Sequence, residues 1–152
     1  MKKLFQTICI VLFTSITFGQ KPETFDKLLN YEKGAKIVIV TTSDSIDQAF
    51  NKIALIIMDY GFNIENSDKT FYYLNTEYTE VGKYSISSKL SVRVKRQDNS
   101  TKIIIKGESA NMGFKIPAGN YYRKKELPSI CFAQMFEIAE LYENGVISVA
   151  KE

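Results

Sequence analysis

The sequence predicts an α+β fold, a two-layer sandwich in which an antiparallel sheet of about four strands carries two helices on one face. Three patterns in the 152 residues indicate it. Apolar residues recur at helical spacing in residues 46–57 and 131–142, and apolar and polar residues alternate in residues 84–95. The expected order is therefore strand, helix, three strands, helix (β-α-β-β-β-α).

The first strand and the first helix follow one another directly. Residues 36–42 form a continuous β-branched run, which is typical of a buried strand. Ser45 and Gln48 have the spacing of a capping box, so we expect a helix to begin there. Its apolar stripe continues to Ile57, and Gly61 is placed to end it in a left-handed conformation.

Three strands are expected next. A turn at residues 65–69 leads into residues 70–78, which are rich in aromatic and β-branched side chains. Alternation in residues 83–97 predicts a half-buried strand with one polar face in water. A turn at residues 97–100 then returns the chain as its hairpin partner, residues 101–109.

The segment GFKIPAGNYYRKKELP, residues 113–128, has no hydrophobic period, so residues 110–128 are expected to form a long loop. Loops longer than about 12–15 residues are often functional or disordered. A helix is expected from Pro128 to Asn144, and residues 146–152 would be a tail that could form a short extra strand.

The N-terminus has the architecture of a secretory signal peptide. Lys2 and Lys3 precede an uncharged apolar run, residues 4–16, and small residues favour cleavage after Gly19. An uncleaved anchor is the alternative, but the run is shorter than the roughly 20 residues of a spanning helix. The protein is therefore expected to be secreted or periplasmic, with no integral membrane segment after cleavage. The expected parts are a signal peptide (1–19), a flexible N-terminal segment (20–35) and a single domain (36–152).

Charge and cysteine usage narrow the possible partners. The chain has 20 Lys and Arg against 17 Asp and Glu, and loss of the signal would remove two lysines, leaving a net charge of about +1. Such a domain gives no case for nucleic acid, which requires a strongly basic face. Cys9 would also be lost, so Cys131 is left without a disulfide partner.

Two stretches of the chain resemble known families. Residues 45–78 (SIDQAFNKIALIIMDYGFNIENSDKTFYYLNTEY) and 90–108 (LSVRVKRQDNSTKIIIKGE) are similar to small secreted bacterial envelope domains of unknown function with a TBP-like fold. They are also similar to the repeated domain of a lipoprotein of the outer-membrane β-barrel assembly machinery. The resemblance spans roughly residues 36–145 and lies in pattern, not in a catalytic motif. It implies a non-enzymatic binding or scaffold role and transfers no site residues, and the chain lacks a lipid-attachment cysteine.

The composition removes several kinds of chemistry. Without histidine there is no Ser-His or Cys-His nucleophile pair, and no cluster of Cys and acids has the spacing of a zinc site. Cys131 lies on an apolar helix stripe and is interpreted as a small buried hydrophobe. We therefore expect no catalytic, cofactor-binding or metal-binding residues and no cofactor. Acids that could still meet across strands are Glu65, Asp68, Glu77, Glu80 and Glu108.

Candidate partner contacts lie on the open face of the sheet, the face without helices, and in the long loop. Alternation places Arg93 and Lys95 on the open face, with tyrosines nearby at positions 72, 73, 78 and 84. An ordinary solvated face is the alternative for these basic residues. The projecting loop residues would be Tyr121, Tyr122, Arg123, Lys124 and Lys125.

These observations together predict a non-catalytic secreted or periplasmic binding or scaffold module. Its partner would be an unknown envelope protein or an anionic surface. Two alternatives are open. Ten Phe and nine Tyr would suit a carrier of a small apolar ligand between helices and sheet, and the strand acids would suit a carboxylate-dependent hydrolase.

Overall fold

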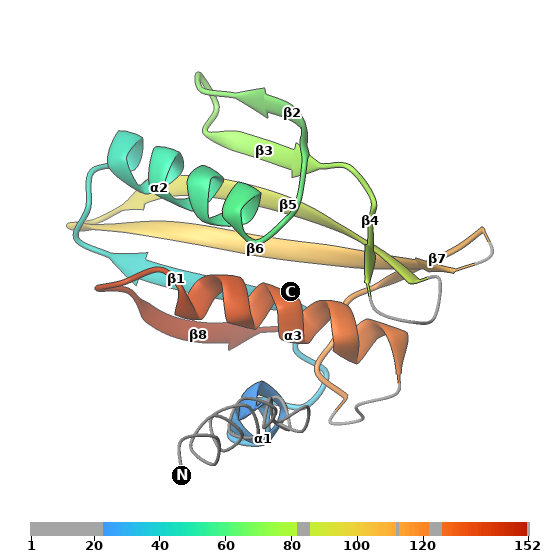
Figure 1. Cartoon of the computed structure of the whole chain (residues 1–152). Coiled ribbons are helices and arrows are strands. Elements are labelled where there is room, and N and C mark those ends of the chain that lie inside the picture. Colours follow the sequence, from blue (N-terminus) through green and yellow to red (C-terminus); the bar gives the residue numbers. More distant parts are fainter. Residues whose placement is uncertain (1–22, 82–85, 112, 122–125, 152) are drawn as a thin grey trace, which may run out of the picture.

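A computed structural model describes residues 23–81, 86–111, 113–121 and 126–151 (Figure 1). In these residues eight strands form one antiparallel sheet, in the order β2-β3-β5-β6-β1-β8, with β4 beside β5 and β7 beside β6. The elements are α1 (Glu23–Leu28), β1 (Ile37–Thr42), α2 (Ile46–Asp59), β2 (Ile64–Asp68), β3 (Tyr73–Thr76), β4 (Thr79–Val81), β5 (Ile86–Gln97), β6 (Ser100–Asn111), β7 (Phe114–Pro117), α3 (Leu127–Glu140) and β8 (Val146–Ala150).

The predicted sandwich of about four strands and two helices was wrong, because the fold is richer in strands and has a third helix. β2 was interpreted as a turn, since its sequence IENSD has no apolar alternation. The four residues of β7 are all exposed, and such a strand carries no hydrophobic period. β8 adds to β1 as an edge strand, so the tail takes the strand option left open by the sequence.

The long β5–β6 hairpin is the centre of the sheet. Its residues pair from Ser87 with Ala110 to Gln97 with Ser100. Along β5 the burial alternates as predicted, with buried residues at positions 86, 88, 90, 92 and 94. The intervening side chains, including Arg93, therefore point to the other face.

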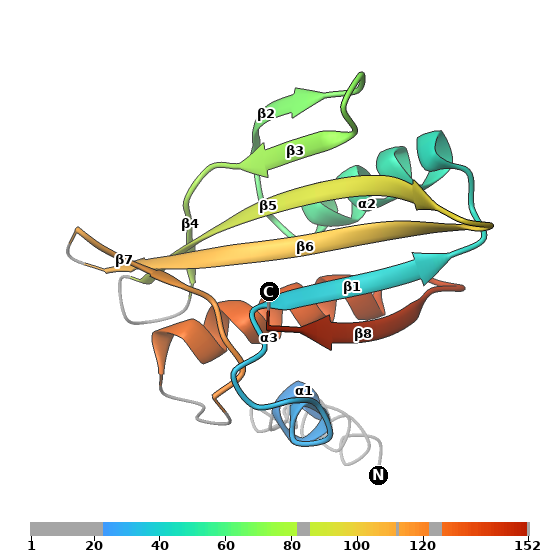
Figure 2. The ribbon, with the colours of Figure 1, turned by 180° about the vertical axis from the view of Figure 1, so that it is seen from behind.

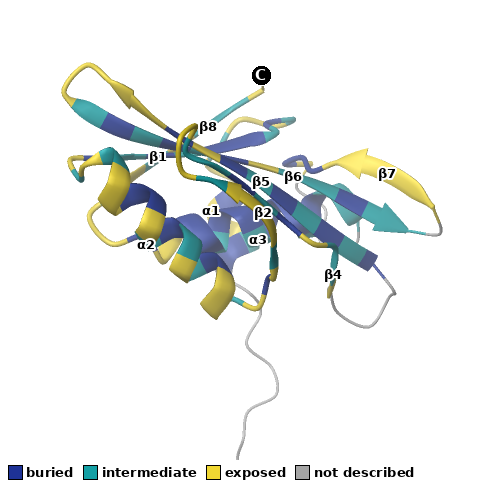
Figure 3. Cartoon of the chain, turned by 90° about the horizontal axis from the view of Figure 1, so that it is seen from above, coloured by how far each residue is buried: buried dark blue, intermediate teal, exposed yellow. Residues whose placement is uncertain are grey.

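Helices α2 and α3 lie on the same side of the sheet (Figures 1 and 2). Figure 3 shows both helices beneath it, and among the described residues no helix lies on the opposite face. Ile53 and Ile57 from α2 and Cys131 and Met135 from α3 are buried in the core, the latter two against Gly107 of β6. The face away from these helices is the open face.

Local signals begin and end α2 as predicted. The Ser45 hydroxyl accepts a hydrogen bond from the Gln48 amide at 3.3 Å, and the Gln48 side chain accepts one from the Ser45 amide at 3.0 Å. This is a complete capping box, which satisfies two backbone donors at the helix start. After the helix, Gly61 has a φ of +107°, which is readily accessible to glycine.

The expectation of a long loop over residues 110–128 was also wrong in part, because β6 continues to Asn111 and β7 pairs with it. Beyond β7 the chain is tied to the N-terminal part of the domain. The buried Asn120 side chain donates to the Leu28 carbonyl at 3.1 Å, and the Asn120 amide donates to the Ala35 carbonyl at 2.8 Å. This part of the segment is packed structure.

The expected signal peptide and its cleavage site lie outside the described residues. Within the expected flexible segment, α1 packs beside α3, with Leu28 buried and an ion pair of 2.8 Å between Lys27 and Glu140. In the described part of the chain, no helix combines the length and apolar character needed to cross a membrane.

Four tyrosine–carboxylate hydrogen bonds tie the elements together. Burial is the largest cause that raises the pKa of the Tyr60, Tyr78 and Tyr142 hydroxyls, and the hydrogen bond to the carboxylate is the second cause. The pKa of Tyr78 is raised to about 12. The pairs are Tyr60 with Glu137, Tyr72 with Asp47, Tyr78 with Glu108, and Tyr142 with Asp44.

Candidate binding site on the open face of the sheet

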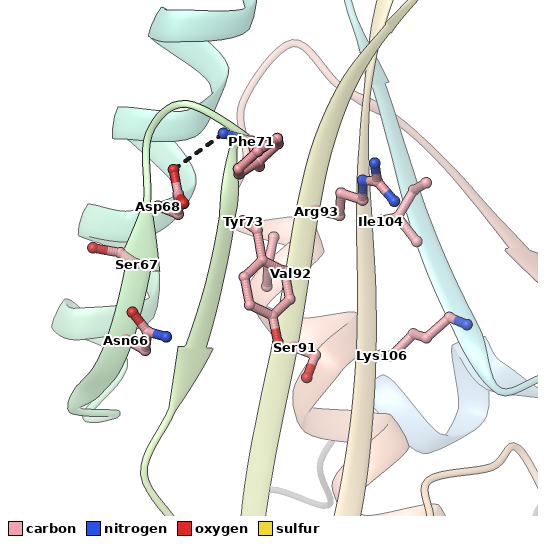
Figure 4. Close-up of a pocket in the computed structure, with 10 residues that line it drawn as sticks. All are labelled: Asn66, Ser67, Asp68, Phe71, Tyr73, Ser91, Val92, Arg93, Ile104 and Lys106. Carbon is pink, nitrogen blue, oxygen red and sulfur yellow. Dashed lines mark hydrogen bonds between the residues drawn. The ribbon is translucent and has the colours of Figure 1, made fainter.

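A hollow of about 690 Å³ lies on the open face, across β2, β3, β5 and β6 (Figure 4). Its volume falls within the range of about 300–1,000 Å³ that is usual for small-molecule sites. We call it the open-face groove. It is lined by Asn66, Ser67, Asp68, Phe71, Tyr73, Ser91, Val92, Arg93, Ile104 and Lys106.

Strand register brings the central side chains of the groove together. Tyr73, Arg93 and Ile104 are directly opposite one another on β3, β5 and β6. In Figure 4 the Arg93 side chain lies beside Ile104, and the Tyr73 ring runs along the strands toward Ser91. Lys106 pairs with Ser91 and extends toward the β1 side of the groove. The groove floor therefore combines an aromatic ring, an aliphatic side chain and two cations.

The β2–β3 turn supplies the end of the groove. One oxygen of Asp68 accepts hydrogen bonds from the amides of Thr70 at 2.7 Å and Phe71 at 3.2 Å. Tyr72 follows with a φ of +50°, and its hydroxyl donates to Asp47 on α2. Tyr72 is thus directed to the helix side, while the neighbouring Phe71 lines the groove with 68% of its surface exposed.

Cations outnumber available anions in the groove. Among the described residues, neither Arg93 nor Lys106 has an ion-pair partner. The one carboxylate in the lining, that of Asp68, is engaged by the turn amides. Beyond the groove, Lys95 lies directly opposite Lys102 on the same face and adds to the positive charge. This face therefore favours an anionic ligand.

A second hollow of about 250 Å³ continues along β6 to Pro117 and shares Ser91 and Lys106 with the groove. Two of its charged side chains already have partners, whereas Lys106 has no ion-pair partner among the described residues. Lys89 forms an ion pair with Glu65, and this hydrogen bond is the main cause that raises the pKa of Lys89. Glu108, which also lines this hollow, accepts a hydrogen bond from Tyr78.

The structure separates the predicted contact residues. Arg93 lines the groove, whereas Lys95 lies on the open face beyond it. Tyr121 is exposed but lines neither hollow, and its amide donates to the Ser129 hydroxyl at 3.4 Å, at the start of α3. The other predicted loop contacts, Tyr122, Arg123, Lys124 and Lys125, lie outside the described residues.

Sequence reasoning missed the wall formed by β2 and the role of Phe71. The available signal was Asp68 followed by Thr70 and Phe71, because an Asp side chain commonly caps the amides of a following turn. Tyr73 was expected only as one of several tyrosines near the open face.

Several reactive groups outside the groove are held in structural contacts. Cys131 is a buried free thiol, as predicted, and burial raises its pKa. Glu77 accepts a hydrogen bond from Asn63 at 3.3 Å, while Glu65 and Glu108 have the partners given above. In the part of the chain that the structure describes, no three Cys, Asp or Glu side chains are grouped as a metal site.

No family model matches this chain, and no curated protein matches it. Its function is therefore argued from the geometry of the groove.

Proposed function

We propose that this protein is a non-catalytic binding module of the bacterial cell envelope and that the open-face groove is its binding site. The observation that carries the proposal is a hollow of ligand size in which two cations, without ion-pair partners among the described residues, lie beside an exposed aromatic ring. The envelope location rests on the signal-peptide pattern of the first twenty residues.

The chemistry of the groove supports binding. Its side chains offer a guanidinium, an ammonium, aromatic rings and neutral polar groups, which are the means by which proteins recognise ligands without reacting with them. The Ser91 hydroxyl donates to the Asn75 side chain at 2.6 Å. That hydrogen bond positions the hydroxyl within the sheet, and among the described residues no hydrogen bond joins it to a basic side chain that would activate it as a nucleophile.

Sedimentation with isolated bacterial envelopes tests the proposal, using the protein purified after export. Reversing both groove charges, in R93E/K106E, should lower the bound fraction by about tenfold, because two charge-assisted contacts are lost. The matched control is K95E/K102E, which changes the net charge equally on the same face outside the groove. Circular dichroism would verify that both variants fold.

Two results would overturn the proposal. If the wild-type protein does not sediment with envelopes at any salt concentration, it has no envelope ligand under these conditions. If both charge-reversed variants lose binding equally, general electrostatic attraction replaces the groove as the cause.

A ligand carrier is the second candidate function, with the ligand placed differently from the sequence-based hypothesis. The space between helices and sheet is filled by fully buried side chains, including Phe132, Ile53 and Ile105. The hollow of small-molecule size lies on the opposite face instead. A carrier would therefore hold its ligand in the open-face groove.

A further inference from the structure

We propose that the open-face groove binds a small amphiphilic anion, a molecule with one acidic group and an apolar body. This inference rests on the proposed function and names the ligand class for the same site. It follows from where the groove places its cations, its apolar side chains and its compensated charges.

The acidic group is expected at Arg93. This side chain lies between Tyr73 and Ile104 in register and has no ion-pair partner among the described residues. A guanidinium can form two parallel hydrogen bonds with one carboxylate or phosphate, which a lysine ammonium cannot. Lys106, two residue pairs further along β6, supplies a second positive charge at the border of the groove.

The apolar body is expected against Phe71, Tyr73 and Ile104. Phe71 is 68% exposed at one end of the groove, and a ligand that covers its ring would remove apolar surface from water. Because Tyr73 is directly opposite Arg93 and Phe71 lines the same groove, one molecule can contact the cation and the apolar side chains together (Figure 4).

In the direction of the second hollow, the distribution of charge favours a small ligand over an extended anionic polymer. A polymer would continue from the groove into the second hollow, where Lys89 is already paired with Glu65. Glu108 adds a carboxylate to the lining there. Beyond Lys106, which both hollows share, further anionic groups would therefore meet a paired lysine and a carboxylate, whereas a single acidic group would find its partner at Arg93.

Paired fluorescent probes test the acidic group. 8-Anilinonaphthalene-1-sulfonate carries an aromatic body and a sulfonate, and N-phenyl-1-naphthylamine is its neutral counterpart. With the protein purified after export, the sulfonate should bind at one saturable site, and R93Q should raise its Kd about ten- to hundredfold. The matched variant K95Q, with the same charge loss outside the groove, should change the Kd by less than about twofold. F71A should weaken both probes, because it removes the ring that both would cover.

The proposal is overturned if R93Q has no larger effect than K95Q, or if the neutral probe binds as tightly as the sulfonate. Decanoate below its micelle concentration and vesicles containing phosphatidylglycerol distinguish a free amphiphile from a membrane surface. Displacement of the sulfonate probe by decanoate supports the proposal, whereas binding to vesicles alone overturns it.

The two proposals can fail separately. If envelopes retain the protein through Arg93 and Lys106 but neither probe nor decanoate binds, the ligand class is wrong and the binding function stands. If envelope binding also fails, both proposals are wrong.

Discussion

Replacing Gly107 with alanine tests how closely α3 packs on the sheet. Gly107 lies in β6, and a Cβ atom there would be 2.8 Å from the Met135 sulfur and 2.9 Å from the Cys131 sulfur. A third contact, with Leu90, would be 3.3 Å. All three neighbouring side chains are fully buried, so they have little free space into which to move.

The expected loss of stability follows from two opposing effects. Adding a methyl group to a filled core costs about 1–3 kcal/mol, and two contacts under 3.0 Å place this site near the upper end. Alanine also restricts the unfolded chain, which offsets up to about 1 kcal/mol. We therefore expect Gly107→Ala to lower the free energy of unfolding by about 2–3 kcal/mol.

Urea unfolding followed by far-ultraviolet circular dichroism measures this change. The double variant G107A/C131A removes one of the two close sulfur contacts, so its loss should be smaller than the sum of the two single losses. Additive losses, or wild-type stability in G107A, would refute the inference that α3 packs directly on the backbone of β6.

Three further predictions concern buried or hydrogen-bonded side chains. Tyr142→Phe removes the 2.6 Å hydrogen bond to Asp44 and should cost about 1.5–3 kcal/mol in urea unfolding; an unchanged midpoint would show that this bond is dispensable. The pKa of Tyr78 is raised to about 12 in the folded protein from an ordinary 10.0, so its contribution to stability is complete below about pH 10 and is lost as pH rises toward 12. Denaturation midpoints measured from pH 8 to 11 should therefore fall less steeply in Tyr78→Phe, and equal slopes would contradict this linkage. The buried Cys131 thiol should react with a disulfide reagent only as the protein unfolds, so rapid labelling of the native protein would contradict its burial.

The sequence was sufficient to predict a strand or a helix where that segment buries one face along its own length. Burial alternates along β5 because one face of the strand packs against the helices, and this period of two is visible in the sequence itself. The start of α2 is likewise local, since Ser45 and Gln48 lie within one helical turn. Cys131 could be placed in the core because it shares a helical stripe with other apolar residues that are also buried.

The missed strands have a different origin. β7 is exposed on every residue and β2 is largely polar, so neither has a buried face that would give a hydrophobic period. They become strands because the long β5–β6 hairpin and β3 offer them backbone hydrogen-bond partners. Both pairings are hairpins between neighbouring segments, Asp68 with Tyr73 and Asn111 with Phe114. They are made by backbone groups and leave no hydrophobic period in the side chains, which is why the number of strands could not be read from that period.

Contacts between segments distant in sequence explain why the candidate site was only partly predictable. The position of Arg93 on the open face follows from alternation within one strand. Three consecutive aromatic residues, Phe71 to Tyr73, give no such indication, because shifting the register by one residue exchanges the faces of Tyr72 and Tyr73. The choice is made by contacts of Tyr72 with α2, where its hydroxyl donates to Asp47 and its ring lies edge-to-face with Phe50 at 5.7 Å. Contacts on the helix side of the sheet therefore determine which aromatic rings are available on the open face.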